Sequence, residues 1–431
     1  MACTPATKKT PTYRIETLGC KSNVYDSQRV ADALEALGYR PVGPGEVPDV
    51  CIVNTCTVTS VADRKSRKTA ARLARRYPAA RLYVTGCYAT ASPQDLAGLP
   101  GLAGVYARDG WRAMLEHIHG GPLPPGCPAV DGDFGIGNFR GRARAFLKIQ
   151  EGCDAFCSYC ILPYVRGKPR SQPLPGVLAE AARLVEAGFG ELVLTGIHLG
   201  LYGRDLAEPV ALADAVRGVA RTPGLGRLRI SSVEATEVDA ALLEAMGHPA
   251  VCAHLHLPLQ SGDAAVLRRM NRRYTPEQFE AAVARARREL DRPAVTTDVI
   301  VGFPGETEPE FENTLAFCRR LRFSRMHVFP FSPRAGTPAA VVPNHVPPAV
   351  TRQRVGRLAE LAEEMAAEWA GGFVDRRVRV LFERRDSAGL LRAYTDRYVP
   401  LTAPGPRRHV GRVAEVLCER SEGNELVGRV T

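Results

Sequence analysis

The sequence predicts an α/β protein in three parts: an amino-terminal doubly wound α/β domain, a central partial (β/α)6 barrel and a small carboxyl-terminal all-β barrel. Three observations predict this fold class. Short apolar strands alternate with helix-periodic segments along two long stretches, a pattern that builds parallel sheets. The last stretch alternates apolar and polar residues, as the strands of a small barrel do. At 431 residues the chain is long enough for several cores. We expect domains at residues 12–122, 139–371 and 373–431.

The first domain is predicted from three strands with helices between them. The strands are expected at residues 13–18, 50–53 and 82–85, and the helices at 26–37 and 61–77. In an open sheet of parallel strands the carboxyl ends share one edge, at which ligands bind. The residues that follow each strand are therefore the first place to look for chemistry.

A cysteine follows each of these three strands, namely Cys20, Cys56 and Cys87. The fold is expected to bring the three thiols together, and three thiolates are a ligand set for an iron–sulfur cluster. Gly19 and Gly86 beside them would let the backbone approach a bulky cofactor. Unrelated burial of each cysteine is the alternative, because free cysteines are often buried. Three coincidences at one sheet edge favour the shared centre.

The second domain is predicted from six strand–helix units that follow a Gly- and Pro-rich linker at residues 120–142. Its strands are expected at residues 146–150, 192–195, 228–231, 253–257, 295–301 and 325–329, and its helices include 178–187, 276–290 and 308–321. A long helix at residues 348–370 closes the domain. The active sites of such barrels lie at the carboxyl ends of the strands.

Three more cysteines, Cys153, Cys157 and Cys160, directly follow the first strand of this barrel with the spacing C-x3-C-x2-C. Thiolates this close in sequence can converge on one metal centre. A closed zinc site needs four ligands, whereas a [4Fe–4S] cluster held by three cysteines keeps one iron open for a further ligand. Tyr159 suits a cofactor that also carries a purine. A zinc site with a remote fourth ligand stays as the alternative.

Further candidate residues follow the other strands of the barrel. Gly196 would let the backbone approach a cofactor, Ser232 and Glu234 offer partners for ribose or amino groups, and the turn at Gly302 could pack a purine. The full candidate set is Tyr159, Gly196, Ser232, Glu234, Gln260, Asp298 and Gly302 for the cofactor, with Gln260 and Arg334 also facing the substrate. Ordinary turn chemistry is the alternative for each of them. His198 and His256 are given no metal, Cys51, Cys252 and Cys318 are expected in the core, and Cys127 is incidental.

The charge of the chain indicates a polyanionic partner. The net charge is +11, and the helix at 61–77 carries seven cations against one acid, Asp63. The final domain, with strands expected at 377–382, 394–401, 410–418 and 426–431, adds Tyr394 and Tyr398 among arginines, a combination that suits RNA by stacking and charge. A solvated helix face and a plain β module are the alternatives.

Cysteine use and hydropathy predict the compartment. The cysteines are clustered and too few for a disulfide scaffold, which suits metal binding in a reducing cytosol. The start of the sequence is polar and no apolar run reaches the length of a membrane-spanning helix. We expect a cytoplasmic protein with no membrane partner.

The C-x3-C-x2-C motif with an aromatic residue before its last cysteine resembles the signature of the radical S-adenosylmethionine (SAM) enzymes. The surroundings of the other cysteines resemble one family within that superfamily, the methylthiotransferases. The matching stretches are residues 17–23, 54–56, 86–87, 256–262, 270–274 and 298–307. The final domain resembles the TRAM domain, an RNA-binding barrel, although Arg397 stands where that domain more often has Asn.

The resemblance implies two [4Fe–4S] clusters and SAM as cofactors. It implies that Cys153, Cys157 and Cys160 bind the cluster that reduces SAM to methionine and a 5′-deoxyadenosyl radical. It also implies that the auxiliary cluster, on Cys20, Cys56 and Cys87, carries a sulfur that becomes methylated. The methylthio group then passes to C2 of an adenosine in the anticodon stem-loop of tRNA, with a reductant protein such as flavodoxin as a further partner.

The residues around the cysteines narrow the choice among the substrates of the family. Lys21 and residues 153–164 are most similar to the branch that acts on N6-threonylcarbamoyladenosine at tRNA position 37. The branches that modify isopentenyladenosine in tRNA or an aspartate of a ribosomal protein are the alternatives. A non-catalytic iron–sulfur RNA-binding protein is the alternative from another class. The sequence leaves the oligomeric state open.

Overall fold

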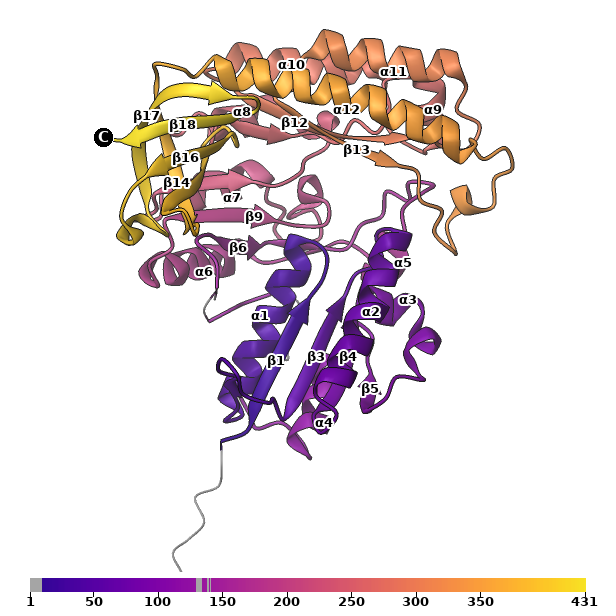
Figure 1. Ribbon diagram of the computed structural model, residues 1–431, viewed down its shortest axis with the longest axis vertical. Coiled ribbons are helices and arrows are strands. Elements are labelled where there is room, and N and C mark those ends of the chain that lie inside the picture. Colours follow the sequence, from indigo (N-terminus) through magenta and orange to yellow (C-terminus); the bar gives the residue numbers. More distant parts are fainter. Residues whose placement is uncertain (1–9, 129–133, 138, 140) are drawn as a thin grey trace, which may run out of the picture. The chain divides into compact units, whose positions relative to one another are not determined.

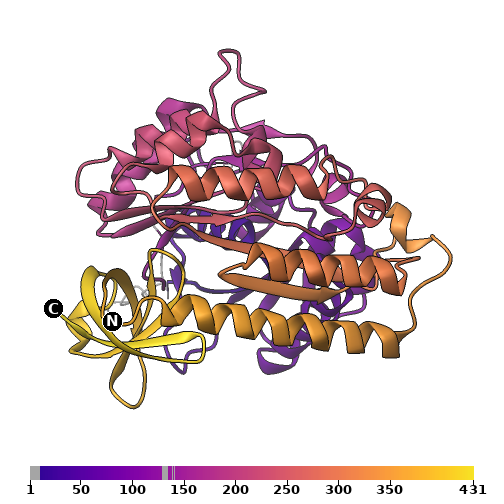
Figure 2. The same cartoon turned by 90° about the horizontal axis from the view of Figure 1, so that it is seen from above.

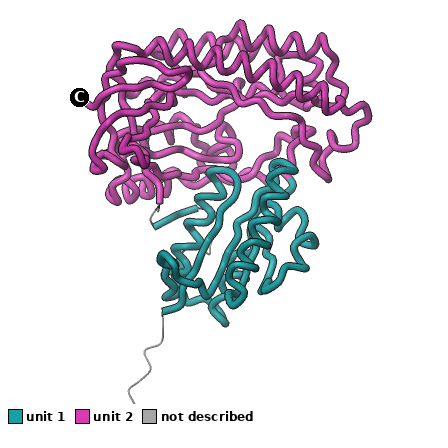
Figure 3. Tube along the Cα trace, in the orientation of Figure 1, with its two compact units in different colours: residues 1–138, 164–167 teal, residues 139–163, 168–431 magenta. Residues whose placement is uncertain are grey.

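The computed structural model describes residues 10–128, 134–137, 139 and 141–431 of the chain. They form two compact units (Figure 3). The first unit takes in the chain up to residue 138 together with the short segment Tyr164–Gly167. The second unit comprises Phe139–Pro163 and Lys168–Thr431.

The first unit is built on a parallel five-stranded sheet with the strand order β2-β1-β3-β4-β5 (Figure 1). The strands are β1 (Thr12–Thr17), β2 (Arg40–Pro41), β3 (Val50–Thr55), β4 (Arg81–Gly86) and β5 (Leu102–Val105), and the helices are α1 (Lys21–Ala36), α2 (Ser60–Arg76), α3 (Cys87–Ala91) and α4 (Trp111–His119). Each face of the sheet has its own core. Ile52 packs with α1 and α4, whereas its neighbours Cys51 and Val53 pack with α2 and α3. Because successive strand residues face opposite sides, this alternation confirms the doubly wound domain.

Helix α1 begins earlier than its apolar periodicity predicts. The prediction placed its start at Asp26, but the helix begins at Lys21, with Cys20 as its N-cap. Its first turns bury polar side chains, among them Asn23, Asp26 and Arg29. Apolar periodicity cannot detect such turns, because the side chains that face inward are polar. Polar side chains are buried only where hydrogen-bond partners are available.

The second unit contains the predicted six parallel strands in two groups of three. The order β10-β9-β6 joins β6 (Ala145–Lys148), β9 (Glu191–Thr195) and β10 (Arg227–Ile230), and the order β11-β12-β13 joins β11 (His254–His256), β12 (Ala294–Val301) and β13 (Arg325–Pro330). A parallel bridge between Leu228 and Val251 connects the groups. The helices that follow the strands are α6 (Leu174–Glu186), α7 (Leu212–Ala220), α8 (Ala240–Met246), α9 (Ala264–Arg269), α10 (Pro276–Glu289) and α11 (Glu308–Leu321). The partial (β/α)6 barrel is confirmed.

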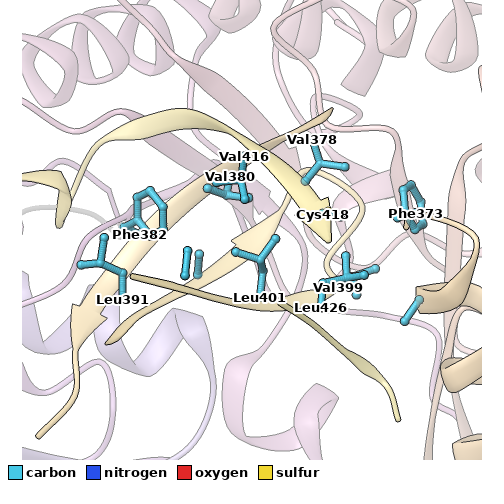
Figure 4. Packing of buried hydrophobic residues seen from close by; sticks show 13 residues of the cluster. Phe373, Val378, Val380, Phe382, Leu391, Val399, Leu401, Val416, Cys418 and Leu426 are labelled. Atoms are coloured by element: carbon cyan, nitrogen blue, oxygen red, sulfur yellow. The ribbon is translucent and has the colours of Figure 1, made fainter. Parts of the chain in front are cut away.

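Helix α12 (Pro348–Gly371) leads from this barrel into a closed β-barrel at the end of the chain (Figures 1 and 2). Its strands are β14 (Arg377–Arg385), β15 (Leu390–Thr395), β16 (Pro400–Pro404), β17 (Val413–Glu422) and β18 (Glu425–Val430). Buried side chains such as Val380, Phe382, Leu401 and Val416 fill it (Figure 4). The small all-β barrel is therefore confirmed.

The strand predicted at residues 394–401 is wrong in detail. A turn after Thr395 divides it into β15 and β16, and the Thr395 hydroxyl accepts the Val399 N–H at 3.0 Å within that turn. Tyr398 adopts a φ of 64°, which ends the extended backbone. Aromatic and β-branched residues favour strands, but the contacts of this turn with the neighbouring barrel decide its backbone. In the described part of the chain, no helix has the length and apolar character needed to cross a membrane.

Candidate active site

The structure brings Cys20, Cys56 and Cys87 to one edge of the first sheet. Cys20 caps α1, Cys56 follows β3, and Cys87 begins α3 directly after β4. A Cβ atom built on Gly19 would lie 2.9 Å from the sulfur of Cys56. Each of the three thiols also lies within electrostatic range of the others. The structure therefore agrees with the prediction that the ends of these parallel strands bring the three cysteines to one edge of the sheet.

Asn23 joins the loops that carry these cysteines. Its Nδ2 donates to the carbonyl oxygens of Leu18 at 2.7 Å and Thr55 at 2.9 Å. The Cys87 thiol lies 3.9 Å from its Oδ1. The side chain is buried, so these contacts are shielded from water. Sequence reasoning missed Asn23, although its position three residues after Cys20 was a usable signal.

Two glycines make this close approach of loops possible. Gly19 and Gly86 have φ values of 102° and 96°, which side chains other than glycine rarely adopt. A Cβ atom at Gly86 would lie 2.6 Å from the backbone nitrogen of Thr55. We predicted that these glycines leave room for a cofactor; in the structure the room is taken by Cys56 and by the residues beside it.

The environment of Cys56 and Cys87 disfavours the ionisation of their thiols without a cation. Burial raises the pKa of Cys87 to about 11 and also raises the pKa of Cys56, whereas Cys20 is exposed. Metal binding requires thiolates. A metal centre supplies the positive charge that buried thiolates need, so the donor chemistry fits an iron–sulfur cluster held by these three residues.

The loop that carries Cys153, Cys157 and Cys160 lies in the second unit and is held by a segment that follows α9. Asn271 Nδ2 donates to the carbonyl of Phe156 at 2.9 Å, and the Ser158 N–H donates to the carbonyl of Met270 at 3.0 Å. Within the loop, the Cys160 N–H donates to the carbonyl of Cys157 at 2.9 Å. These bonds fix the backbone between the cysteines, which is the order that a preformed ligand loop needs.

Two cationic side chains contact the sulfur atoms of this loop. His198 Nδ1 lies 3.5 Å from Cys153 Sγ, while its Nε2 lies 2.6 Å from Glu237. Burial opposes the charge of this imidazole, but its hydrogen bonds to Cys153 and Glu237 raise the pKa of His198 to about 10. Arg272 Nη1 donates to Cys157 Sγ at 3.4 Å. Sequence reasoning gave His198 no role and missed Arg272, because both act through residues distant in the chain.

The three thiols of this loop also fit a thiolate-bound centre. All are free, and burial raises the pKa of Cys160 to about 12. Among the residues that the structure describes, no three His, Cys, Asp or Glu side chains are already arranged around a metal position. The thiols thus gather at two places, in the first unit and in the second, and have to turn inward to enclose a cluster.

The other predicted site residues fall into separate groups. Tyr159 packs against a cluster that contains Phe303, the neighbour of Gly302, so the two elements expected to receive a purine do meet. Gly302 itself faces helix α12, since a Cβ there would lie 2.8 Å from Thr351 Cγ2. Gly196 lies against Gln150, whose Oε1 accepts the N–H groups of the two residues that follow Gly196.

Ser232, Gln260 and Asp298 lie close together at the carboxyl ends of neighbouring strands. Ser232 bridges to His256, His256 Nε2 lies 3.3 Å from Asp298 Oδ2, and the Gln260 N–H donates to the carbonyl of Asp298 at 2.8 Å. Glu234 forms an ion pair with Arg272. Arg334 is buried, with 7% of its surface exposed. The structure therefore groups Ser232, Gln260 and Asp298 at the predicted edge of the barrel.

A cavity of about 310 Å³ lies beside the cysteine loop. Its lining includes Cys157, His198, Glu234 and Arg272, together with the exposed arginines Arg204 and Arg273. Guanidinium groups bind carboxylates through paired hydrogen bonds. The cavity can therefore receive an anionic ligand next to the sulfur atoms.

Tyr398 serves the contact between the two barrels of the second unit. Its ring stacks on His254 at a centroid distance of 5.1 Å, and the guanidinium of Arg229 lies 4.6 Å from its centroid. Arg229 also donates to the carbonyls of Thr395 and Asp396, at 3.0 Å each. The prediction that Tyr398 stacks on RNA is therefore not supported, because its ring is already in contact with the core.

Buried charges anchor this contact. Glu191 is fully buried and accepts hydrogen bonds from Arg227 and Arg229. Burial opposes its ionisation, but Arg229, Arg227 and Arg144 hold the pKa of Glu191 at about 2. Arg144 also pairs with Glu383 of β14. The ion group therefore joins the strands of the partial barrel to the β-barrel that follows them.

Comparisons with known proteins agree with this architecture. Residues 12–105 match a family described as "Uncharacterized protein family UPF0004", and residues 147–318 match the Radical SAM superfamily. The structure is similar to the radical S-adenosylmethionine methyltransferase TsrM from Kitasatospora setae, with a TM-score of 0.57 at 16% identity over 77% of each chain. At that identity the likeness shows the fold alone. Membership of the superfamily implies SAM and a [4Fe–4S] cluster as cofactors.

Relatives match over nearly the whole chain. The threonylcarbamoyladenosine tRNA methylthiotransferase MtaB of Bacillus subtilis is 37% identical over 94% of this chain and 93% of its own length. The protein of the same name from Thermotoga maritima is 35% identical over 90% of each chain. The tRNA-2-methylthio-N(6)-dimethylallyladenosine synthase of Parafrankia sp. is 38% identical over 93% of this chain and 85% of its own length. Together with the two groups of three cysteines, these relatives show that the chain belongs to the radical SAM tRNA methylthiotransferase family.

Proposed function

We propose that this protein transfers a methylthio group to C2 of N6-threonylcarbamoyladenosine at position 37 of tRNA. In this proposal Cys153, Cys157 and Cys160 hold the [4Fe–4S] cluster that binds SAM, and Cys20, Cys56 and Cys87 hold the auxiliary [4Fe–4S] cluster. The two sets of free, partly buried thiols support it. Bound SAM supplies the radical chemistry that an inert aromatic C–H bond requires.

The chain's own residues bind and orient the reactants. His198, fixed by Glu237, and Arg272, fixed by Glu234, donate to the sulfur atoms of Cys153 and Cys157. Hydrogen bonds to cluster sulfurs set reduction potentials. Contacts with SAM stay a prediction for Tyr159, Gly196, Ser232, Glu234, Gln260, Asp298 and Gly302.

The cavity beside Cys157 is the observation that carries the choice of substrate. A threonylcarbamoyl group ends in a carboxylate, whereas a dimethylallyl group is apolar. Arg204 and Arg273 line this cavity and are exposed, while the carboxylates that line it, Glu234 and Glu237, are already paired with Arg272 and His198. Burying an apolar group against guanidinium groups would cost hydration without compensation. A carboxylate gains charge-assisted hydrogen bonds there.

Sequence identity does not separate the two tRNA branches, because relatives of both names are 35–38% identical to this chain. Dimethylallyladenosine in tRNA is therefore the competing substrate. Methylthiolation of a ribosomal protein is less well supported, since the chain carries a net charge of +11 that suits RNA.

The test is anaerobic reconstitution followed by reaction with SAM, dithionite and tRNA that carries either modified adenosine. Nucleoside mass spectrometry identifies the product. An adduct on threonylcarbamoyladenosine alone supports the proposal, and an adduct on dimethylallyladenosine alone overturns the substrate but not the reaction. Formation of 5′-deoxyadenosine with no RNA adduct overturns the tRNA assignment.

Variants of the cavity sharpen the test. Arg204→Leu and Arg273→Leu should raise KM for threonylcarbamoyladenosine-tRNA about tenfold for each lost charge-assisted bond, while SAM cleavage without RNA is retained. Arg288→Leu, on the exposed side of α10, is the matched control. Equal KM values in all three variants would show that the cavity does not read the carboxylate.

A further inference from the structure

Arg166, the last residue of α5 (Leu162–Arg166), is a buried cation of the first unit. Its side chain is fully buried. Its Nη1 lies 3.2 Å from Asp26 Oδ2, and its Nη2 donates to Asn23 Oδ1. In sequence it follows Cys160 by six residues. The segment that follows one cysteine motif therefore supplies a cation to the unit that contains the other three cysteines.

The guanidinium lies close to the sulfur atom of Cys87. Arg166 Nη2 donates to Asn23 Oδ1, and Cys87 Sγ lies 3.9 Å from the same oxygen. Through Asn23 Oδ1, which it shares with the Cys87 thiol, the guanidinium also fixes the amide that holds the loops before Cys20 and Cys56.

We propose that Arg166 is a positioning residue that stabilises negative charge at the centre held by Cys20, Cys56 and Cys87 and so raises the reduction potential of that centre. This inference rests on the proposed function, which assigns an iron–sulfur cluster to these three residues. Reduction adds one negative charge to a cluster. A cation shielded from water stabilises the reduced form more than the oxidised form, because Coulomb interactions strengthen in a low dielectric.

Asp26 sets the size of this effect. Its carboxylate lies against the same guanidinium and is buried, so it cancels part of the charge that the sulfur atoms experience. Removing the cation and removing its counter-charge should therefore move the potential in opposite directions. A merely structural Arg166 would give no such opposite shifts, because both substitutions would loosen the same contact.

The test uses the full chain with Cys153, Cys157 and Cys160 replaced by alanine. In this background only the centre formed by Cys20, Cys56 and Cys87 can bind iron. After anaerobic reconstitution, iron and sulfide are measured, and an EPR-monitored redox titration gives the midpoint potential. The variants in this background are Arg166→Met, Arg166→Lys and Asp26→Asn. Lys168→Met, two residues away at an exposed position, removes the same charge and is the matched control.

We expect a more negative midpoint in Arg166→Met, a smaller shift in Arg166→Lys, a more positive midpoint in Asp26→Asn and no shift in Lys168→Met. Normal iron content with unchanged midpoints in both Arg166→Met and Asp26→Asn overturns the inference alone. If Arg166→Met does not fold, Arg166→Lys and Asp26→Asn decide by the same signs. Absence of iron from the background protein overturns the auxiliary cluster of the proposed function, and the inference with it.

Discussion

The Asn23 side chain donates a hydrogen bond to the backbone carbonyl of Thr55 at 2.9 Å, and this bond ties the first turn of α1 to the residue before Cys56. The same amide donates to Leu18, two residues before Cys20. One buried side chain thus positions two of the strand ends that carry cysteines. The gathering of these cysteines depends on polar contacts of α1 as much as on the parallel sheet itself.

Replacing Asn23 by Leu should loosen this edge of the sheet. The buried carbonyl of Thr55 and the partly buried carbonyl of Leu18 lose their donor. A buried unsatisfied group costs about 1–3 kcal/mol. Hydrogen exchange measured by mass spectrometry should show faster exchange in peptides that cover the start of α1 and the end of β3. Asn424→Leu removes an amide that contacts Glu363 at the surface and should leave exchange unchanged. Equal protection in both variants would contradict a positioning role for Asn23.

Gly86→Ala should destabilise the first unit more than a positive φ alone explains. Its Cβ would lie 2.6 Å from the Thr55 backbone nitrogen, a distance that forces the ends of β3 and β4 apart. Gly45→Ala is the matched control, because Gly45 has a φ of 78° with no atom near its Cβ position. We expect a loss of about 1 kcal/mol in the control and several times that in Gly86→Ala, measured by thermal unfolding. Similar losses of stability in the two variants would show that the ends of β3 and β4 can move apart at little cost.

Acid should weaken the junction between the two barrels through Glu191. Its pKa is about 2 in the folded protein against an ordinary value of 4.5. A lowered pKa means that the stabilisation is complete above pH 4.5 and is lost as the pH falls toward 2, by about 3 kcal/mol in total. Unfolding followed from pH 6 to pH 2 should show this loss, and Glu191→Gln should remove it. Glu280→Gln, which breaks an exposed pair with Arg320, is the control and should keep the wild-type pH dependence.

The sequence allowed both groups of cysteines to be predicted, one from spacing and the other from position after the predicted strands. Cys153, Cys157 and Cys160 are close in the chain, so a short loop suffices to gather them. Cys20 and Cys56 are remote, and their proximity followed from the rule that parallel strands end at one edge. The residues that orient them, Asn23 among them, escaped prediction because a buried polar side chain has no periodic signature.

Tyr398 shows where local reasoning fails. Its aromatic ring predicted a strand and a stacking platform for RNA. In the structure, stacking on His254 and the guanidinium of Arg229 holds it in a left-handed turn at the barrel junction. Both partners are more than a hundred residues away in sequence. Tertiary contacts that override local propensity are invisible without the fold.

The cations of α2 should bind the phosphates of tRNA. Arg64, Lys65 and Lys68 are exposed on one side of the helix that begins shortly after Cys56, and the described residues give them no acidic partner. Each phosphate that a cation neutralises adds about 1 to the slope of log affinity against log salt. Changing all three to Gln should therefore lower this slope by about 2 to 3 and weaken binding, as measured by filter binding from low to physiological salt.

The control for this prediction is a triple change of the same charge elsewhere. Arg288, Arg320 and Arg352 are exposed cations of α10, α11 and α12, and their replacement by Gln should leave the slope unchanged if binding is local to α2. The two triple variants have the same net charge, so a general loss of attraction would affect both equally. Equal slopes in the two variants would show that α2 is only a solvated face, whereas a lower slope for the α2 variant alone identifies it as an RNA contact.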